Sequence, residues 1–435
     1  MSLRRMTAAQ WRAAGLSRRL DLGAGEDQVA AVRAICRQVA LRGDAALREY
    51  SRRFDGWAPE GDEPLALGPE RLRAALDALP PAQRSALELA AARVRAFHEV
   101  QVFPDLEGPE GLRLLTRPVR RAGLYVPGGR APYPSTVLMT AIPARVAGVA
   151  EVLLATPPAS DGSVAASILA AAALAGVDRV YRMGGAQAIA AFAYGTETVP
   201  RVDVVAGPGN LYVNLAKREV FGAVGVDAVA GPTEILVVAD AAAPPELVAA
   251  DLASQLEHDP MAWAVLVTDS PGLADAVEES FGDLLRHLDR AEVVQAARCC
   301  IVLAASLEEA VELANDFGPE HLELIGEEAE RLLDRVENAG AVFLGPSTPV
   351  SLGDYVIGPN HTLPTAGAAR FASPLGVHTF LKRRSVARVS PEALEALADA
   401  ACTLARMEGL TAHAHAIEVR RRPGAGEPGR GEGTG

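Results

Sequence analysis

From Ala122 onward, short apolar runs alternate with longer segments whose apolar residues recur at helical spacing. The first series of apolar runs predicts β-strands at residues 123–126, 151–155, 179–183 and 202–206. Helices are predicted between them at residues 135–149, 163–176 and 186–194. This strand–helix–strand alternation is typical of a parallel sheet with helices on its faces.

A second series of apolar runs predicts strands at residues 234–239, 262–268, 300–304 and 341–344, again with helices between them. The two series predict an α/β protein with two incomplete, Rossmann-like parallel-sheet domains. We expect one α/β domain to combine residues 27–122 with residues 234–375. The other, residues 123–233, would be inserted into it.

Smaller segments are predicted outside the two α/β domains, at the two ends of the chain. Residues 1–26 are expected to form a helical arm that ends at Gly23 and Gly25, and a long amphipathic helix should then run from Asp27 toward Tyr50. Residues 376–421 are expected to be a helical segment, with helix from Pro391 onward. Residues 422–435 are rich in proline and glycine and are expected to be disordered.

Composition narrows the class of protein. At 435 residues, 49% of them hydrophobic and 22% charged, the chain fits a soluble globular enzyme of two or more domains. A net charge of −13 argues against binding to nucleic acid or to an anionic membrane. The chain has neither an apolar signal-peptide region at its start nor the roughly 20 apolar residues that span a bilayer.

Four cysteines without a C-x-x-C spacing suit a reducing compartment, so we expect a cytoplasmic protein without a thiolate zinc site. Lys217 and Lys382 are the only lysines, which leaves few candidates for a Schiff-base mechanism.

Three glycine-rich turns follow predicted strands, at residues 127–129, 184–187 and 207–210. Each lies where the carboxyl end of a parallel strand meets a helix, which is the usual ligand crevice of open α/β sheets. One such turn alone is most often only a tight turn, but three in succession favour a dinucleotide-binding edge. The G-x-G-x-x-G match at residues 424–429 follows no strand and opens no helix, so we set it aside.

Five polar motifs stand out in the last 180 or so residues, and five of the eight histidines lie within or beside them. The motifs are S-Q-L-E-H-D-P (254–260), G-P-E-H-L-E-L (318–324), G-D-Y (353–355), G-P-N-H (358–361) and E-G-L-T-A-H (408–413). They supply nitrogen and oxygen ligands, without cysteine, for a divalent metal such as Zn²⁺. We interpret the cluster as a catalytic site.

The candidate ligands each have an ordinary alternative. Gln255 and His258, three residues apart near the end of a predicted helix, would share one face, but could equally be a solvent-facing or capping pair. Asp354 follows a glycine in a stretch expected to be non-helical, where a turn aspartate is common. His413 lies in the predicted C-terminal helical region and could simply be exposed. The sequence alone does not bring these residues together.

Glu320 and His321 are adjacent, so a pair that acts together should lie on a turn or at a helix end. A neutral histidine suits proton abstraction from an alcohol, and a glutamate can activate water for attack on a carbonyl carbon. A surface Glu–His pair is the equal alternative. His361, after Asn360, is a candidate to orient or contact a substrate, with a turn histidine as the alternative.

Taken together, these motifs closely resemble the histidinol dehydrogenase family, zinc- and NAD-dependent enzymes that end histidine biosynthesis. The resemblance runs from about Asp27 to about Val419. It also includes G-L-Y-V-P-G-G (123–129), G-G-A-Q-A-I-A (184–190), A-G-P-G-N (206–210) and G-P-T-E (231–234).

The resemblance implies a function and a set of roles. The reaction would be the NAD-linked, four-electron oxidation of L-histidinol, through L-histidinal, to L-histidine. One Zn²⁺ per subunit would be bound by Gln255, His258, Asp354 and His413, and Glu320 and His321 would be the acid/base pair. NAD would contact Tyr125, Gln187 and Asn210. The substrate contacts would be Thr233, Gln255, His258, His321, Asp354, Glu408 and His413.

The family often has serine where this chain has Thr233, so the resemblance implies a changed fit with the hydroxyl retained. It also implies a homodimer in which the C-terminal segment of one subunit reaches the site of the other. Glu408 and His413 would then act in trans.

The residues themselves are also compatible with three other functions. A related zinc/NAD dehydrogenase could act on another small alcohol, although Glu408 and the full ligand set favour histidinol. A metal-dependent hydrolase could use Glu320 as its base, but the three glycine-rich turns favour a dinucleotide. A non-catalytic metal-binding module has no need of a Glu–His pair.

Overall fold

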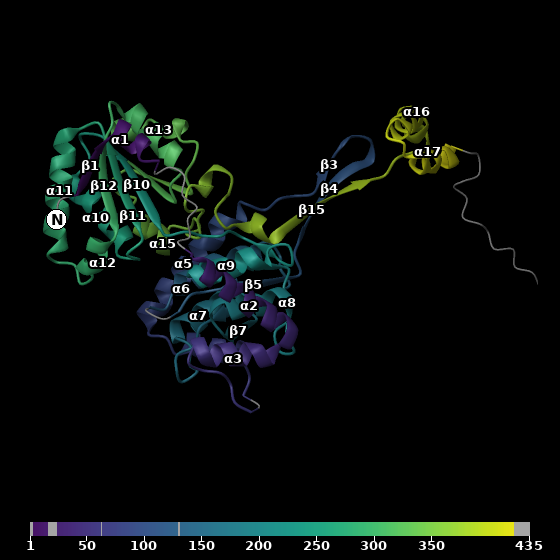
Figure 1. Cartoon of the computed structure of the whole chain (residues 1–435), viewed down its shortest axis with the longest axis horizontal. Coiled ribbons are helices and arrows are strands. Elements are labelled where there is room, and N and C mark those ends of the chain that lie inside the picture. The colour runs from purple at the N-terminus through teal and green to yellow at the C-terminus, as the bar shows by residue number, and fades with distance from the viewer. Residues whose placement is uncertain (1–2, 16–23, 62, 129–130, 422–435) are drawn as a thin grey trace, which may run out of the picture. The chain divides into compact units, whose positions relative to one another are not determined.

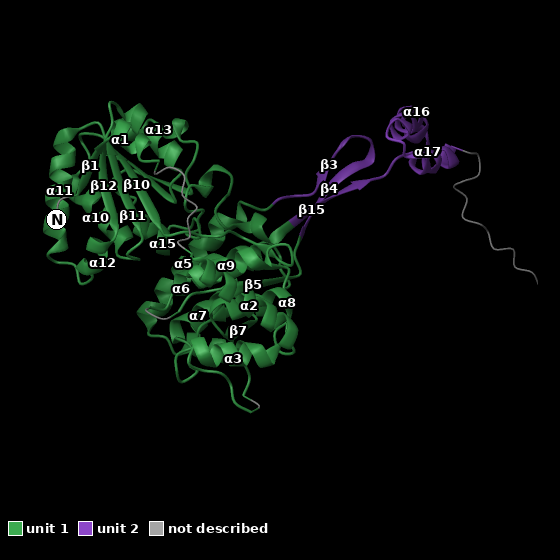
Figure 2. Ribbon diagram, in the orientation of Figure 1, with its two compact units in different colours: residues 1–102, 118–381 green, residues 103–117, 382–435 purple. Residues whose placement is uncertain are grey.

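The computed structural model describes residues 3–15, 24–61, 63–128 and 131–421 (Figure 1). The predicted tail at 422–435 and part of the predicted arm, residues 16–23, lie outside the described residues. The chain divides into two compact units, residues 1–102 with 118–381 and residues 103–117 with 382–435 (Figure 2). In the described part, no helix has the length and apolar character needed to cross a membrane.

The first unit contains a six-stranded parallel sheet, here called sheet A, in the order β1-β12-β11-β10-β13-β14. Its strands are β1 (Arg4–Thr7), β10 (Glu234–Ala239), β11 (Trp263–Thr268), β12 (Arg298–Leu303), β13 (His321–Ile325) and β14 (Ala341–Leu344). The four strands predicted in this part of the chain are confirmed. Strand β13, next to the central β10, was not predicted.

Both faces of sheet A are buried. Along β10, Ile235 and Val237 belong to one apolar core and Leu236 and Val238 to the other, because successive side chains point to opposite faces. The covering helices are α1 (Ala8–Ala13), α10 (Pro245–Leu256), α11 (Pro271–Leu285), α12 (Ala291–Ala296), α13 (Leu307–Phe317), α14 (Glu327–Glu330) and α15 (Val350–Tyr355).

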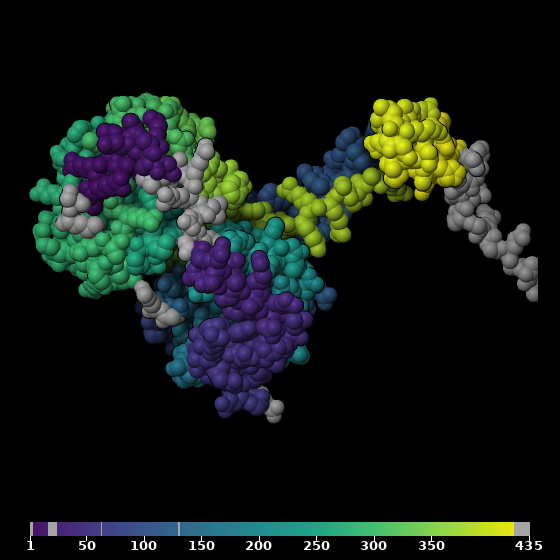
Figure 3. Space-filling view, in the orientation of Figure 1, coloured from purple at the N-terminus to yellow at the C-terminus, as the bar shows by residue number. Residues whose placement is uncertain are grey.

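The N-terminal arm is not purely helical, so that prediction is wrong for Arg4–Thr7. These residues form the edge strand β1, parallel to β12, and Thr7 then begins α1 through a capping box with Gln10. Trp11 in α1 is buried against Phe317 at 5.7 Å between ring centroids. Pairing and packing with residues about 300 positions away override the local pattern. In Figure 3 the first purple residues accordingly lie against the green and teal atoms at the upper left.

A second six-stranded sheet, sheet B, has the order β2-β7-β6-β5-β8-β9, with β2 antiparallel at one edge and the other strands parallel. Its strands are β2 (Ala66–Leu67), β5 (Arg121–Tyr125), β6 (Glu151–Thr156), β7 (Arg179–Arg182), β8 (Val204–Ala206) and β9 (Gly225–Val226). The crossover helices are α6 (Pro134–Val146), α7 (Ala166–Ala175), α8 (Gly185–Tyr194) and α9 (Leu211–Val220). The strands and helices predicted between residues 123 and 206 are confirmed.

The helices that precede sheet B pack on it, contrary to the predicted assignment of residues 27–122 to the other domain. Helix α2 contacts α8 and α9, α4 contacts α7, and α5 contacts α6. Apolar residues of α2, such as Val32 and Val39, share a core with Ile189 of α8. These helices are α2 (Glu26–Arg42), α3 (Asp44–Phe54), α4 (Pro69–Asp77) and α5 (Pro81–Glu99).

The long helix predicted from Asp27 toward Tyr50 is in fact two helices, α2 and α3. Gly43 separates them with φ +53°, where a Cβ would lie 2.3 Å from Glu197 Oε2. Glu197 in turn accepts a hydrogen bond from the first backbone N–H of α3, at Asp44.

The second unit consists of a three-stranded sheet and two helices. The sheet has the order β15-β4-β3, from β15 (Leu381–Ala387), β4 (Leu112–Pro118) and β3 (Leu106–Glu107). Helices α16 (Pro391–Met407) and α17 (Thr411–Glu418) pack through Cys402, Ala405 and Ala414. The helix predicted from Pro391 is confirmed. The helical prediction is wrong for β15, whose backbone pairs with the distant β4. Short 3₁₀ turns in the second unit are η1 (Pro109–Gly111) and η5 (Val419–Arg421). Those in the first unit are η2 (Leu333–Arg335), η3 (Ala368–Arg370) and η4 (Val377–Phe380).

Candidate active site

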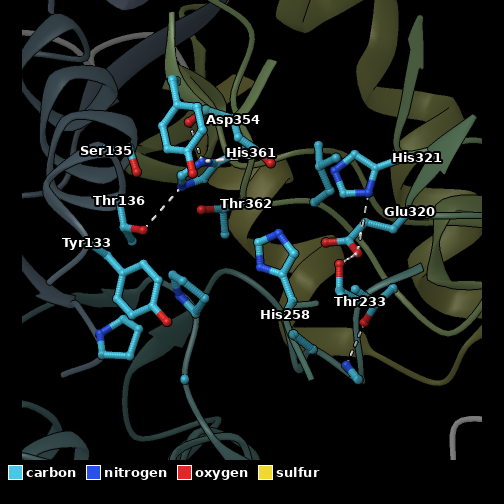
Figure 4. A pocket seen from close by; sticks show the side chains of 18 residues that line it. Tyr133, Ser135, Thr136, Thr233, His258, Glu320, His321, Asp354, His361 and Thr362 are labelled. Carbon is cyan, nitrogen blue, oxygen red and sulfur yellow. Dashed lines mark hydrogen bonds and ion pairs between the residues drawn. The ribbon is translucent and has the colours of Figure 1, made fainter. Parts of the chain in front are cut away.

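A cavity of about 280 Å³ in the first unit is lined by half of the predicted site residues, namely Thr233, His258, Glu320, His321, Asp354 and His361 (Figure 4). On one side it is lined by Pro127 and Pro208, which follow strands β5 and β8 of sheet B. On the other side it is lined by Thr233 and Glu320, which immediately precede β10 and β13 of sheet A. The carboxyl edge of one parallel sheet therefore faces the amino edge of the other across the cavity.

Two hydrogen bonds from residues at the start of strand β10 orient the carboxylate of Glu320 in this cavity. Its Oε2 accepts a hydrogen bond from Thr233 Oγ1 at 2.6 Å and from the Glu234 backbone N–H at 2.9 Å. The Thr233 hydroxyl oxygen in turn accepts a hydrogen bond from the side-chain amide of Gln255, at the end of α10. Thr233 therefore connects a helix residue to the carboxylate, and its one hydroxyl hydrogen is committed to Glu320.

His321 is buried as the first residue of β13, and its Nδ1 lies 2.9 Å from the backbone oxygen of Glu234. A carbonyl oxygen only accepts hydrogen bonds, so Nδ1 carries the proton and Nε2 presents a free lone pair. Burial lowers the pKa of His321, which keeps the ring neutral. Glu320 and His321 were expected on a turn or at a helix end. Glu320 does lie at a bend, between α13 and β13, whereas His321 is the first residue of the central strand β13.

Three carboxyl groups near this histidine have raised pKa values. Burial raises the pKa of Glu320 to about 7, against the hydrogen bonds from Thr233 and Glu234. Burial and the nearby Glu320 raise the pKa of Glu234 to about 8. Burial raises that of Asp354 to about 6. No arginine or lysine is among the described residues that line the cavity.

His258 and Asp354 both face the cavity, as expected of metal ligands. His258 lies just beyond the end of α10, where it is exposed, and partial desolvation by the surrounding protein lowers the pKa of its ring. Asp354 lies in helix α15, so the prediction of a non-helical stretch is wrong. The first backbone N–H of α15, at Val350, donates to Glu323 Oε1 of β13 at 3.1 Å. This capping contact comes from a distant strand, so the local sequence does not indicate it.

His361 also lines the cavity, and two hydrogen bonds set its ring. Its Nδ1 lies 2.9 Å from the backbone oxygen of Asp354, and Thr136 Oγ1 lies 3.3 Å from its Nε2. Burial lowers the pKa of His361 to about 4. The preceding Asn360 is buried and donates to the Met139 backbone oxygen at 2.6 Å. His361 is therefore a neutral ring beside Asp354. Its orientation is set in part by Thr136 of helix α6, which is far from His361 in the sequence.

The residues expected to contact NAD lie at the carboxyl edge of sheet B. The Tyr125 hydroxyl accepts a hydrogen bond from the Gly185 backbone N–H at 3.0 Å, and Gln187 Nε2 donates to Asp55 Oδ2 at 3.2 Å. Asn210 caps α9 by accepting from the Val213 backbone N–H at 3.2 Å. Tyr125 and Gln187 are buried, whereas Asn210 is exposed. Gly129 of the first glycine-rich turn lies outside the described residues.

Glu408 and His413 belong to the second unit, where Glu408 ends α16 and His413 lies in α17, both exposed. Among the described residues, no group of three or more His, Cys, Asp or Glu side chains lies close enough together to hold a metal ion.

Sequence reasoning missed several residues of the cavity. They are Tyr133, Ser135, Thr136, Tyr355, Thr362 and Thr365. Glu234 was quoted within a motif but given no role. Ser135 and Thr136 follow the glycine-rich turn after β5 and begin α6, and this position next to a predicted ligand crevice was the one available signal.

A sequence model of the histidinol dehydrogenase family matches residues 22–421. The chain belongs to the histidinol dehydrogenase family. A histidinol dehydrogenase of Parasynechococcus marenigrum is 50% identical over 414 residues, which cover 94% of each chain. One of Pseudomonas fluorescens is 50% identical over 394 residues, 89% of each chain.

The crystal structure of histidinol dehydrogenase from Elizabethkingia anophelis superposes with a TM-score of 0.89 at 33% identity, covering 96% of this chain and 98% of that one. The family resemblance predicted from the motifs is confirmed, and with it the expected α/β fold and the class of NAD-dependent oxidoreductase. The relatives match almost from end to end, so the family's signature covers both sheets and the cavity between them.

Proposed function

We propose that this member of the histidinol dehydrogenase family oxidises L-histidinol to L-histidine through L-histidinal, in the cytoplasm, with two molecules of NAD⁺. The observation that carries the proposal is the pairing of two different bases in one cavity. His321 presents a free imidazole lone pair, and Glu320, with a pKa of about 7, lies with its Oε2 3.6 Å from His321 Nδ1. His321 can accept the proton of an alcohol, and Glu320 can accept a proton from water.

In the first oxidation, His321 Nε2 accepts the proton of the substrate hydroxyl, and NAD⁺, when bound, would supply the acceptor for the hydride of the carbinol carbon. The product is the aldehyde. The imidazolium formed on His321 is stabilised because its Nδ1–H donates to the Glu234 backbone oxygen. That contact also fixes the ring so that Nε2, and not Nδ1, is the base.

In the second oxidation, Glu320 accepts a proton from water as the oxygen attacks the aldehyde carbon. Loss of a second hydride from the hydrate, for which a second NAD⁺ would be the acceptor, leaves the carboxylic acid. A pKa of about 7 lets Glu320 take and release this proton near neutral pH. No cysteine is among the described residues that line the cavity, which supports water rather than a covalent thiohemiacetal.

The donors that face the cavity fit a divalent cation. An imidazole of lowered pKa at His258 and a carboxylate at Asp354 are ligands of the type that zinc prefers, and no protein cation competes for the carboxylate. In the proposal Gln255, His258, Asp354 and His413 hold one Zn²⁺ per subunit. When bound, Zn²⁺ would fix the substrate's imidazole and amino nitrogens and so orient its carbinol carbon.

We assign the remaining substrate and cofactor contacts by the family's motifs. Thr233, Gln255, His258, His321, Asp354, His361, Glu408 and His413 would contact substrate. Tyr125, Gln187 and Asn210 would contact NAD. Support for the cofactor site comes from the position of these three residues at the turns after the strands of sheet B, where the helix N-termini of α8 and α9 favour phosphate.

Glu408 and His413 would be supplied by a second copy of the chain in a homodimer with shared sites. Support comes from helix α16, which exposes three large apolar side chains to solvent: Leu397 (51%), Leu404 (59%) and Met407 (78%). Apolar surface of this kind on a small unit is typical of a protein–protein interface.

The decisive experiment is the stoichiometry of NADH formed per molecule of limiting L-histidinol by the purified, zinc-loaded enzyme. Two equivalents are expected for the double oxidation. One equivalent would identify an alcohol dehydrogenase that stops at the aldehyde. No NADH, in a protein that binds NAD and zinc, would mean that another alcohol is the substrate.

A further inference from the structure

A buried ion pair lies beneath the dinucleotide-binding edge of sheet B. Lys217 of α9 and Asp227, which follows β9, are in contact at 2.5 Å between Nζ and Oδ1, and their side chains are only 2% and 3% exposed. Transferring both charges out of water is costly, so such a pair is weak evidence for a gain in stability. Neither residue lines the cavity of the site.

Both members of this pair bind the same residue of the chain. Lys217 Nζ donates to the backbone oxygen of Gly207 at 2.9 Å, and the Gly207 backbone N–H donates to Asp227 Oδ2 at 2.8 Å. Gly207 has φ +115°, and a Cβ at that position would lie 2.2 Å from the backbone oxygen of Tyr125. The turn is thus held by its two polar backbone atoms at a point where no side chain fits.

Asn214, three residues before Lys217 on α9, extends the network to the wall of the cavity. Its Nδ2 donates to the Gly209 backbone oxygen at 2.9 Å, and its Oδ1 accepts from the Ala230 backbone N–H at 3.0 Å. Gly209 and Ala230 both line the cavity. One face of α9 therefore ties together the turn at 207–210 and the segment at 227–231, which come from separate parts of the chain.

We propose that the Lys217–Asp227 pair is a positioning device that sets the 207–210 turn for the dinucleotide. The pair does not touch the ligand but holds the backbone that does. A flexible turn would pay for its ordering each time the dinucleotide binds, whereas a clamped turn is already ordered. This inference rests on the proposed function, because it assumes that NAD binds at this turn.

The test compares NAD binding with substrate use in full-length, zinc-loaded protein. Lys217→Met removes the charge and the hydrogen bond to Gly207, and Lys217→Arg keeps the charge but not the size of the ammonium. Lys217→Met combined with Asp227→Asn removes both charges and leaves an acceptor for the Gly207 N–H. The matched control is Arg145→Met, because Arg145 also clamps backbone, at Val149 and Gly176, but at the opposite, amino edge of sheet B.

We expect the Kd for NAD⁺, measured by calorimetry, to rise about fivefold or more in the variants that carry Lys217→Met, the effect of one lost hydrogen bond, and to rise less in Lys217→Arg, which keeps the charge. The KM for L-histidinol at saturating NAD⁺ should stay within about twofold, which is less than that effect. Arg145→Met should leave the Kd for NAD⁺ unchanged even where its Tm falls as far as that of the Lys217 variants.

Three results would overturn the proposal: a folded Lys217→Met variant with wild-type Kd for NAD⁺, an equal rise in Arg145→Met, or failure of every Lys217 variant to fold. The last would make the pair a requirement of the fold alone. If the unsubstituted protein binds NAD⁺ without oxidising L-histidinol, the proposed substrate is wrong, but the ratio of Kd values still decides the role of the pair.

Discussion

Thr233 donates its hydroxyl hydrogen to Glu320 Oε2 across 2.6 Å, so a side chain from the start of β10 supports a carboxylate at the start of β13. This hydrogen bond opposes the effect of burial and lowers the pKa of Glu320 from what burial alone would make it. The fraction of Glu320 that is ionised at neutral pH therefore depends on Thr233.

Thr233→Val should impair aldehyde oxidation more than alcohol oxidation, by about fivefold for one lost hydrogen bond. The ionised form of Glu320 is the active base, so the rate of L-histidinal oxidation should rise with pH through about 7 in the unsubstituted enzyme. In Thr233→Val the inflection should move to higher pH. Thr233→Ser keeps the hydroxyl and is the control. An unshifted pH profile in Thr233→Val would exclude this role of the hydroxyl.

His321→Ala should reduce oxidation of L-histidinol by about 10²- to 10⁴-fold, the usual contribution of a general base. Oxidation of supplied L-histidinal should suffer much less, because that step depends on Glu320. Glu320→Ala should show the reverse pattern. Single-turnover measurements on the two half-reactions separate them, and equal losses in both would contradict the division of roles.

His258→Ala should release zinc while the protein stays folded, because His258 lies beyond the end of α10 and outside the apolar cores. Metal content after dialysis, together with the circular dichroism spectrum, measures both effects. The affinity for zinc should also begin to weaken as the pH falls below about 6, because a proton then competes with the metal for Asp354. His287→Ala, at an exposed histidine after α11, is the matched control. Full zinc occupancy in His258→Ala would rule out the ligand assignment.

Mixing two inactive proteins, His321→Ala and His413→Ala, should restore activity if sites are shared between subunits. A random hybrid dimer would carry one site that lacks both groups and one that lacks neither, so about half of the hybrid's sites should work. Subunit exchange must be shown independently, for example with differently tagged chains. Proven exchange without recovery would indicate sites built within single chains.

Glu234→Gln should change how stability depends on pH. The folded protein holds the Glu234 proton up to a pKa of about 8, above the ordinary value of 4.5, so the folded state binds more protons than the unfolded state between these values. The free energy of unfolding should therefore fall as pH rises from about 5 to about 8. Glu234→Gln should flatten this slope in denaturant titrations while keeping the acceptor for the Ala366 N–H. An unchanged slope would assign the pH dependence to other groups.

Periodicity was sufficient for most of the regular structure, because strands such as β10 and β14 are local apolar runs bounded by polar residues or glycine. It failed where distant contacts decide the backbone. Strand β1 exists because β12 pairs with it, and α15 begins where Glu323 accepts the Val350 N–H. Strand β13 was missed because its buried Glu323 and His321 make it look polar, and their burial becomes intelligible only beside β10.

The sequence by itself determined the family, the two series of α/β units and the residue types of the site, since these are properties of order and spacing along the chain. Only the tertiary structure decided that Thr233, Glu320 and His321 meet at the amino edge of one sheet, opposite the glycine-rich turns of the other. It also decided which histidine nitrogen is free, because that depends on a backbone oxygen of a neighbouring strand. Likewise the clamp of Lys217 and Asp227 on Gly207 depends on burial, which a linear sequence does not specify.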